Sequence, residues 1–126
     1  MSETAQRSEA RQLLVDLVDI PSVSGDERAC AERLRAFFER HGREAWVDDA
    51  GNVRAPADDG VLLTSHIDTV PGNSPVRVET IPDEEVCWGG DDPLSEGSEH
   101  EVLWGRGSVD AKGCLASMAV AAVRTG

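Results

Sequence analysis

The sequence predicts an α/β layered domain. Two amphipathic helical patterns come first, several short β-type stretches follow, and a helix rich in small residues comes last. Blocks of helices and strands in this arrangement are typical of layered α/β folds. With 126 residues and 40% apolar content, the chain can bury one modest core, so we expect one domain or part of one.

The first helix is expected over residues 8–18. Leu14, Leu17 and Val18 recur at helical spacing and share one face with Ala10. The segment around Pro21 ends this helix, because proline disfavours helical geometry at the residue before it.

A second helix is expected to run to about His41, with Ser24 or Asp26 as its N-terminal cap. Four apolar side chains would form its core stripe, namely Cys30, Leu34, Phe37 and Phe38. Gly42 stands where a C-terminal glycine cap belongs.

Strands follow the helices. Residues 44–48 and 52–55 are predicted to form a hairpin around a tight turn. The run from Val61 to Ser65 fits a strand buried on both faces. Shorter strands are expected at 76–78 and 102–104, with an acidic surface insertion over about 79–101 between them, and residues 112–123 should form the last helix.

The charge balance excludes some classes of partner. The chain has 24 acidic and 12 basic residues, for a formal net charge of −12. Nucleic acids and anionic membranes are therefore not expected to bind. Lys112 is the only lysine, and an acidic, lysine-poor composition resembles that of proteins from salt-loving organisms such as haloarchaea; an ordinary acidic protein is the alternative.

Cysteine spacing and the N-terminus indicate the compartment. Cys30, Cys87 and Cys114 are odd in number and contain no Cys-x-x-Cys pair, so we expect reduced thiols. The polar, acidic N-terminus has no signal-peptide pattern, so a cytoplasmic location is expected. His41 and His100 are expected to be surface residues.

The first candidate for chemistry is His66 with Asp68, directly after the apolar run. In an extended segment, side chains two residues apart project to the same side. A metal-bound imidazole needs an acceptor for its second nitrogen, and a nearby carboxylate can provide it. The alternative is that His66 is a partly buried polar residue and Asp68 a turn former.

The second candidate is Asp110 in the stretch Gly-Arg-Gly-Ser-Val-Asp-Ala-Lys-Gly (residues 105–113). A dinucleotide-binding fingerprint is excluded, because Asp110 stands where the third glycine is needed. The glycines instead indicate a tightly bent backbone that presents one carboxylate, which could coordinate one or two divalent metals. The alternative is a helix N-cap.

Together the two motifs resemble the zinc-dependent aminoacylase and carboxypeptidase superfamily known as M20. The resemblance extends to the Ile-Pro-Ser-Val-Ser-Gly loop at residues 20–25 and the Asp-Asp-Ala-Gly-Asn-Val hairpin at residues 48–53. Within this superfamily, Leu-Leu-Thr-Ser-His-Ile-Asp-Thr-Val-Pro-Gly and the later Pro-Val-Arg-Val-Glu are most similar to the amino-group-carrier-protein lysine/ornithine hydrolases.

The resemblance implies a role for each candidate. His66 would be a zinc ligand, Asp110 a carboxylate that bridges two zinc or cobalt ions, and Asp68 the catalytic-site aspartate that hydrogen-bonds the ligating histidine. It also implies a cis peptide between Asp110 and Ala111. The implied fold is the N-terminal portion of a three-layer catalytic domain with a central mixed sheet.

The implied activity is metal-dependent amide hydrolysis that frees lysine or ornithine from a carrier protein. Acetylornithine deacetylase, succinyl-diaminopimelate desuccinylase and carboxypeptidase activities are alternatives, with a small N-acyl amino acid or a peptide as the substrate. In this superfamily the general-base glutamate, the other metal ligands and a smaller domain that supports homodimers come after the residue that Asp110 matches. We therefore expect residues 1–126 to be an inactive fragment, or in a different class a non-catalytic truncated remnant.

Overall fold

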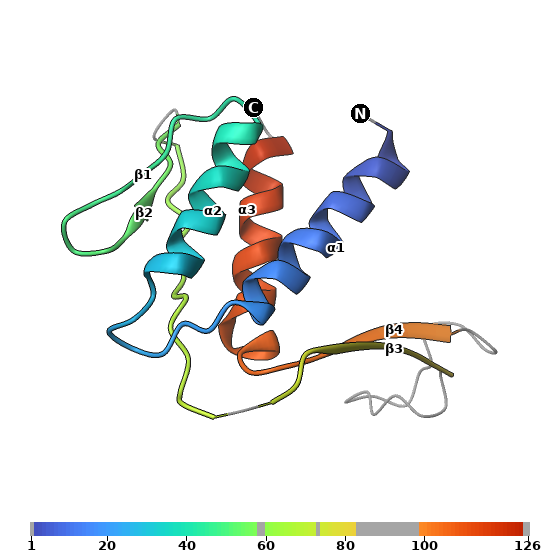
Figure 1. Cartoon of the computed structure of the whole chain (residues 1–126). Coiled ribbons are helices and arrows are strands. Elements are labelled where there is room, and N and C mark those ends of the chain that lie inside the picture. The colour runs from blue at the N-terminus through green and yellow to red at the C-terminus, as the bar shows by residue number, and fades with distance from the viewer. Residues whose placement is uncertain (1, 58–59, 73, 83–98, 125–126) are drawn as a thin grey trace.

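The computed structural model describes residues 2–57, 60–72, 74–82 and 99–124. Three helices pack together, and two short hairpins flank them (Figure 1). Because helices and strands both occur, the α/β class is confirmed. The strands described here form two separate two-stranded antiparallel sheets, so the central mixed sheet and the three layers stay a prediction.

Helix α1 (Glu3–Asp19) begins five residues before the predicted start. The reason is a cap that periodicity cannot reveal: Ser2 Oγ accepts a hydrogen bond from the backbone N–H of Ala5, at 3.1 Å. Its buried residues are Leu13, Leu17 and Val18, so Leu13 belongs to the core and Leu14 only borders it.

Helix α2 (Arg28–Arg40) buries all four predicted stripe residues. Its predicted cap is wrong, because the residue at the cap position is Glu27, which makes no side-chain cap hydrogen bond. Ser24 lies further upstream and has a different partner, described below. Gly42 has a φ of 74° directly after the helix, as expected for a glycine that ends it.

The predicted first hairpin is confirmed and is short. Strands β1 (Trp46–Val47) and β2 (Val53–Arg54) pair antiparallel, with Trp46 opposite Arg54. The side chain of Asp48 holds the turn, because its carboxylate accepts hydrogen bonds from the backbone N–H groups of Ala50 and Asn52. The hairpin packs against α2.

The prediction of a buried strand over Val61–Ser65 is wrong for this structure. These residues are in no strand, and Val61, Leu62 and Leu63 are 82%, 87% and 51% exposed. The apolar run has the composition of a buried strand, but no described segment pairs with its backbone.

A second hairpin forms where the two ends of the acidic insertion were predicted. Strands β3 (Arg77–Pro82) and β4 (Glu99–Trp104) pair antiparallel along their whole lengths, from Arg77 opposite Trp104 to Pro82 opposite Glu99. Residues 79–82 and 99–101 therefore belong to strands, and the rest of the predicted insertion lies outside the described residues. An ion pair between Arg11 and Glu101 links this hairpin to α1.

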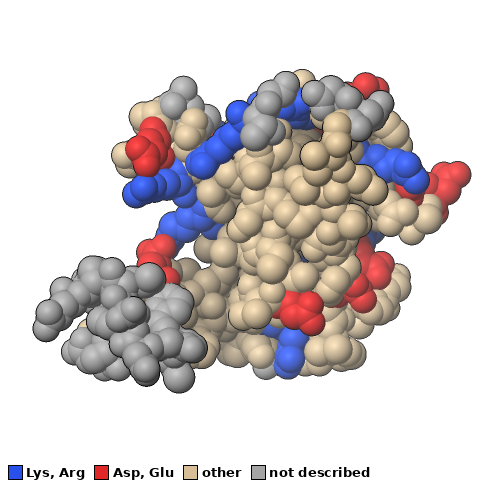
Figure 2. Space-filling view, turned by 180° about the vertical axis from the view of Figure 1, so that it is seen from behind, with Lys and Arg blue, Asp and Glu red and all other residues tan. Residues whose placement is uncertain are grey.

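After β4 the chain makes a short, wide helical turn, η2 (Ser108–Gly113), and then helix α3 (Cys114–Arg124). The core lies where the three helices meet, with Leu13 and Leu17 from α1 packed near Leu115, Ala116 and Ala119 from α3. Seen from behind, the centre of the molecule is uncharged and charged residues surround it (Figure 2).

Candidate functional site

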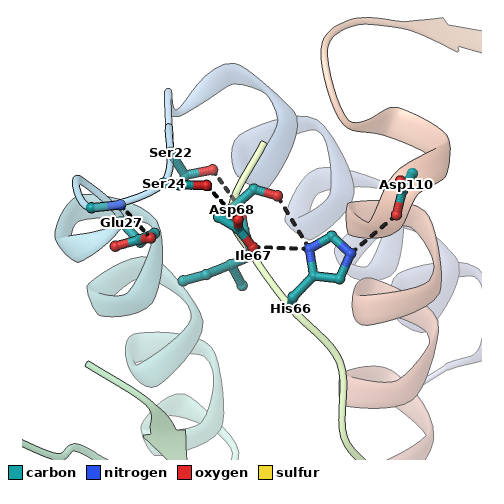
Figure 3. A network of polar contacts seen from close by, with 8 residues as sticks. Ser22, Ser24, Glu27, His66, Ile67, Asp68 and Asp110 are labelled. Atoms are coloured by element: carbon teal, nitrogen blue, oxygen red, sulfur yellow. Dashed lines mark hydrogen bonds and ion pairs between the residues drawn. The ribbon is translucent and has the colours of Figure 1, made fainter. Parts of the chain in front are cut away.

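The imidazole of His66 lies between two carboxylates that come from different parts of the chain (Figure 3). Its Nδ1 atom lies 3.1 Å from Asp68 Oδ1 and 3.2 Å from the Asp68 backbone oxygen. Its Nε2 atom lies 3.0 Å from Asp110 Oδ1, although the two residues are 44 positions apart. The three residues singled out by the sequence therefore meet at one place, while their roles as ligands or catalytic groups stay predictions.

The turn that carries Asp110 explains how its carboxylate reaches His66. Gly107 has a φ of 79°, in the left-handed region that favours glycine, and Asp110 has non-helical backbone angles inside η2. The peptide between Asp110 and Ala111 is cis, as the resemblance implied. Because α3 begins only at Cys114, Asp110 is not its N-cap, and its side chain is 88% exposed.

Hydrogen bonds set the proton affinities at the site. The hydrogen bond to the Asp110 carboxylate is the largest cause that raises the pKa of His66, and contacts with Asp68 add to it. A hydrogen bond from Ser24 is the largest cause that lowers the pKa of Asp68, and the charge of His66 acts in the same direction. The contacts with Asp110 and Asp68 therefore favour the protonated form of the His66 imidazole.

Sequence reasoning missed the residues that hold this arrangement. Ser24 Oγ donates a hydrogen bond to Asp68 Oδ2, at 2.6 Å, and Ser22 Oγ donates to the backbone oxygen of Ile67, also at 2.6 Å. Both serines lie in the loop between α1 and α2, and their spacing carries no signal for a contact more than 40 residues away. Only the loop's resemblance to a known family drew attention to it.

Lys112 is a third residue that the sequence did not single out for this role. Its side chain is buried, and Nζ donates a hydrogen bond to the backbone oxygen of Ile20, at 2.9 Å. Burial lowers the pKa of Lys112, because a charged ammonium is less well solvated in the interior than in water. The lysine thereby connects the Asp110 turn to the α1–α2 loop.

The described residues provide only part of a metal site. They contain no group of three or more His, Cys, Asp or Glu side chains placed to hold one ion. The chemistry of the donors nevertheless suits zinc or cobalt, which bind imidazole nitrogen and carboxylate oxygen. Among the described residues, no helix has both the length and the apolar character needed to span a membrane.

His41, which the sequence predicts at the surface, is partly buried, with 22% of its side chain exposed. Its Nε2 atom lies 2.8 Å from Glu9 Oε1, and its ring centroid lies 4.7 Å from that of Phe37. It lines a cavity of about 410 Å³ between α1, α2 and α3, to which none of His66, Asp68 and Asp110 contributes. His41 therefore has a packing role that is separate from the candidate site.

Comparison with known proteins shows that the chain is similar in sequence to several hydrolases. No protein-family model matches it. It is 42% identical to the LysW-lysine hydrolase of Deinococcus radiodurans over 96% of the chain, and 29% identical to the LysW-lysine/LysW-ornithine hydrolase of Saccharolobus islandicus over 92% of the chain. An Emericella nidulans protein named as a carboxypeptidase is 39% identical over 87% of the chain.

The alignments cover the relatives only in part. The chain spans 29%, 28% and 25% of the lengths of these three proteins, in the order given. The similarity nevertheless covers nearly all of the chain and includes both candidate motifs within its span. The chain is therefore a homologue of the LysW-lysine and LysW-ornithine hydrolases, over less than a third of their length.

Proposed function

We propose that this chain forms part of a metal-dependent amidohydrolase that releases lysine or ornithine from an amino-group carrier protein in the cytoplasm. The observation that carries the proposal is the imidazole of His66 with its two nitrogens directed at Asp68 and Asp110. The name of the Deinococcus radiodurans relative, at 42% identity, supplies the substrate class.

In this proposal His66 Nε2 and an Asp110 oxygen are ligands of a divalent zinc or cobalt ion, and Asp110 also binds a second ion. The 3.0 Å between these two atoms allows both to contact one ion at ordinary bond lengths of about 2.0–2.2 Å. When bound, such ions acidify water and polarise the scissile carbonyl. Asp68 accepts a hydrogen bond from Nδ1–H of His66, and the proton stays on Nδ1, which leaves the Nε2 lone pair free to bind.

The remaining parts of the site belong to the same proposal. A glutamate general base, further ligands, the completed three-layer sheet and a domain that supports homodimers would come from polypeptide outside residues 1–126. One imidazole and one bridging carboxylate do not close a zinc site, which takes four ligands. We therefore expect the chain alone to bind metal weakly and to hydrolyse no amide.

A chimera tests the proposal directly. In the Deinococcus radiodurans hydrolase, the segment aligned with this chain would be replaced by residues 1–126, and the purified protein assayed on LysW-lysine with added Zn²⁺ or Co²⁺. We expect hydrolysis, its loss in His66→Ala and Asp110→Asn, and its retention in the matched control His41→Gln. A folded chimera that hydrolyses LysW-lysine equally well with and without His66 would contradict the proposal.

A second substrate class has its own support. The relative from Emericella nidulans is named as a carboxypeptidase, and its 39% identity is close to the 42% of the LysW-lysine hydrolase. The same chimera should therefore be assayed on a dipeptide, as a carboxypeptidase substrate, and on N-acetylornithine and N-succinyl-diaminopimelate. If kcat/KM is higher on one of these compounds than on LysW-lysine, that compound, and not the carrier-linked amino acid, is the substrate of the proposed enzyme.

A further inference from the structure

The loop between α1 and α2, residues 20–27, contacts the His66 segment through backbone and side-chain groups. Ser22 is fully buried; its Oγ donates to the backbone oxygen of Ile67, and its own backbone oxygen accepts from the N–H of Thr69, at 2.9 Å. Val23 and Thr69 form a parallel β-bridge. The loop therefore fixes the backbone on both sides of Asp68.

One side chain of this loop touches the candidate site itself. Ser24 Oγ donates to Asp68 Oδ2, and the other carboxylate oxygen, Oδ1, faces His66 Nδ1. The interactions form one chain from Ser24 through Asp68 and His66 to Asp110, and Figure 3 shows these side chains in line. A carboxylate held at one oxygen presents the other in a fixed direction, so Ser24 determines how Asp68 meets the imidazole.

The same loop also holds the opposite half of the site. Lys112 Nζ donates to the backbone oxygen of Ile20, and Lys112 lies two residues after Asp110. Fixing Asp68 to the loop therefore also fixes it relative to the turn that carries Asp110. Because both Asp68 and the Asp110 turn are attached to this loop, the loop holds residues from distant parts of the sequence in fixed positions relative to one another.

Among the described residues, no contact gives Ser24 a structural role other than its bond to Asp68. It is exposed, it lies outside helices and strands, and the N-cap of α2 is Glu27. Within the part of the chain that the structure describes, its side chain donates one hydrogen bond, to Asp68, so the serine is directed at the site and not at the core.

We propose that Ser24 is a positioning residue: its hydroxyl orients the Asp68 carboxylate so that Asp68 holds the Nδ1–H form of His66 and leaves Nε2 free for a divalent cation. The part of this inference that concerns the cation rests on the proposed function. The part that concerns the orientation of His66 does not, because the hydrogen-bond chain exists without a metal.

Two measurements on the 126-residue chain test the inference. Nitrogen-15 NMR of the imidazole ring, at a pH where His66 is neutral, reports which ring nitrogen carries the proton, with His66 assigned by its absence in His66→Ala. Competition with a chromophoric chelator reports the affinity for Co²⁺. Both are made on the wild-type chain, Ser24→Ala and Ser24→Thr. The matched control is Ser117→Ala, because that exposed serine donates to the backbone oxygen of Gly113, four residues away.

In Ser24→Ala we expect the tautomer population to shift from Nδ1–H toward Nε2–H, and the affinity for Co²⁺ to fall roughly three- to tenfold. The thermal midpoint should stay unchanged, since Ser24 is exposed. Ser24→Thr should restore both readouts because it keeps the hydroxyl, and Ser117→Ala should match the wild type. A Ser24→Ala chain with wild-type tautomer and affinity would overturn the inference, and so would a threonine variant that behaves like alanine.

The His66→Ala chain separates this inference from the proposed function. If it binds Co²⁺ as well as the wild type does, the metal role of His66 fails, while the tautomer shift in Ser24→Ala still decides the role of Ser24. If His66→Ala loses Co²⁺ binding and Ser24→Ala changes neither readout, the proposed function stands and the role of Ser24 fails.

Discussion

Substitution of Gly107 by alanine tests the geometry of the turn that presents Asp110. Gly107 has a φ of 79°, a conformation that costs a residue with a side chain about 1–2 kcal/mol. A Cβ atom at this position would lie 2.6 Å from Cγ2 of Thr69, which is too close, while its contacts with Asp110 O and Lys112 Cδ at 3.6 Å are ordinary. Overpacking of this kind typically costs about 1–3 kcal/mol.

The two contributions together predict that Gly107→Ala lowers the free energy of unfolding by about 2–5 kcal/mol. This is a large share of the roughly 5–15 kcal/mol that stabilises a typical domain. Urea denaturation followed by circular dichroism measures the change, with the slope of the transition used to check that the variant remains two-state.

A double-mutant cycle separates the two causes. Thr69→Ser removes the clashing methyl group and keeps the hydroxyl, at a cost of about 1 kcal/mol for the lost buried carbon. In this background Gly107→Ala should cost only the conformational 1–2 kcal/mol, so the coupling energy should be about 1–3 kcal/mol. Equal penalties in both backgrounds would refute the steric part of the reasoning, and a penalty under about 0.5 kcal/mol in the wild type would refute both parts.

Three further predictions concern the rest of the molecule. Arg54 and the turn N–H groups lower the pKa of Asp48 to about 2, so this group stabilises the first hairpin fully above its ordinary pKa of 3.8, and the contribution disappears as the pH falls through about 2. NMR of the hairpin amides should show this loss, and Asp48→Asn should remove the pH dependence; a hairpin with the same pH profile in that variant would contradict it. Leu17→Ala should destabilise by about 2–5 kcal/mol because Leu17 is fully buried, whereas Leu62→Ala should stay within about 0.5 kcal/mol; thermal or chemical unfolding measures both, and a large effect at Leu62 would mean that its segment is packed in solution. With a net charge of −12, stability should rise from low to molar KCl as self-repulsion is screened, and an unchanged midpoint would exclude a dependence on salt.

Local patterns predicted the elements whose partners lie close in the sequence. The apolar stripe of α2 and the hairpin around Asp48 were found because their side chains repeat at the spacing of a helix or flank a tight turn. The start of α1 was missed because the cap at Ser2 depends on one side-chain hydrogen bond and not on periodicity.

The errors over Val61–Ser65 and Ser24 have a common origin. An apolar run predicts burial only when another segment pairs with it, and the described strands provide no such partner. Serine is a common helix-capping residue, yet the hydroxyl of Ser24 donates a hydrogen bond to Asp68, 44 residues away. In both cases the outcome depends on contacts between distant segments, which local propensity does not contain.

The same limit applies to the candidate site. His66, Asp68 and Asp110 were found because their residue types are those that bind metals and activate water, and because their motifs resemble a known family. Ser22 and Lys112 carry no such chemical signature. They were found only when the structure placed their polar atoms within 3 Å of Ile67 and Ile20.

The β3–β4 hairpin also has a consequence for how His66 and Asp110 are connected. Its ladder keeps Pro82 opposite Glu99 at one end and Arg77 opposite Trp104 at the other. The register of this ladder therefore sets where the chain leaves the hairpin toward Asp110. His66 and Asp110 lie 44 positions apart in the sequence, and the chain between them folds back on itself through this ladder, so that the imidazole and the carboxylate meet.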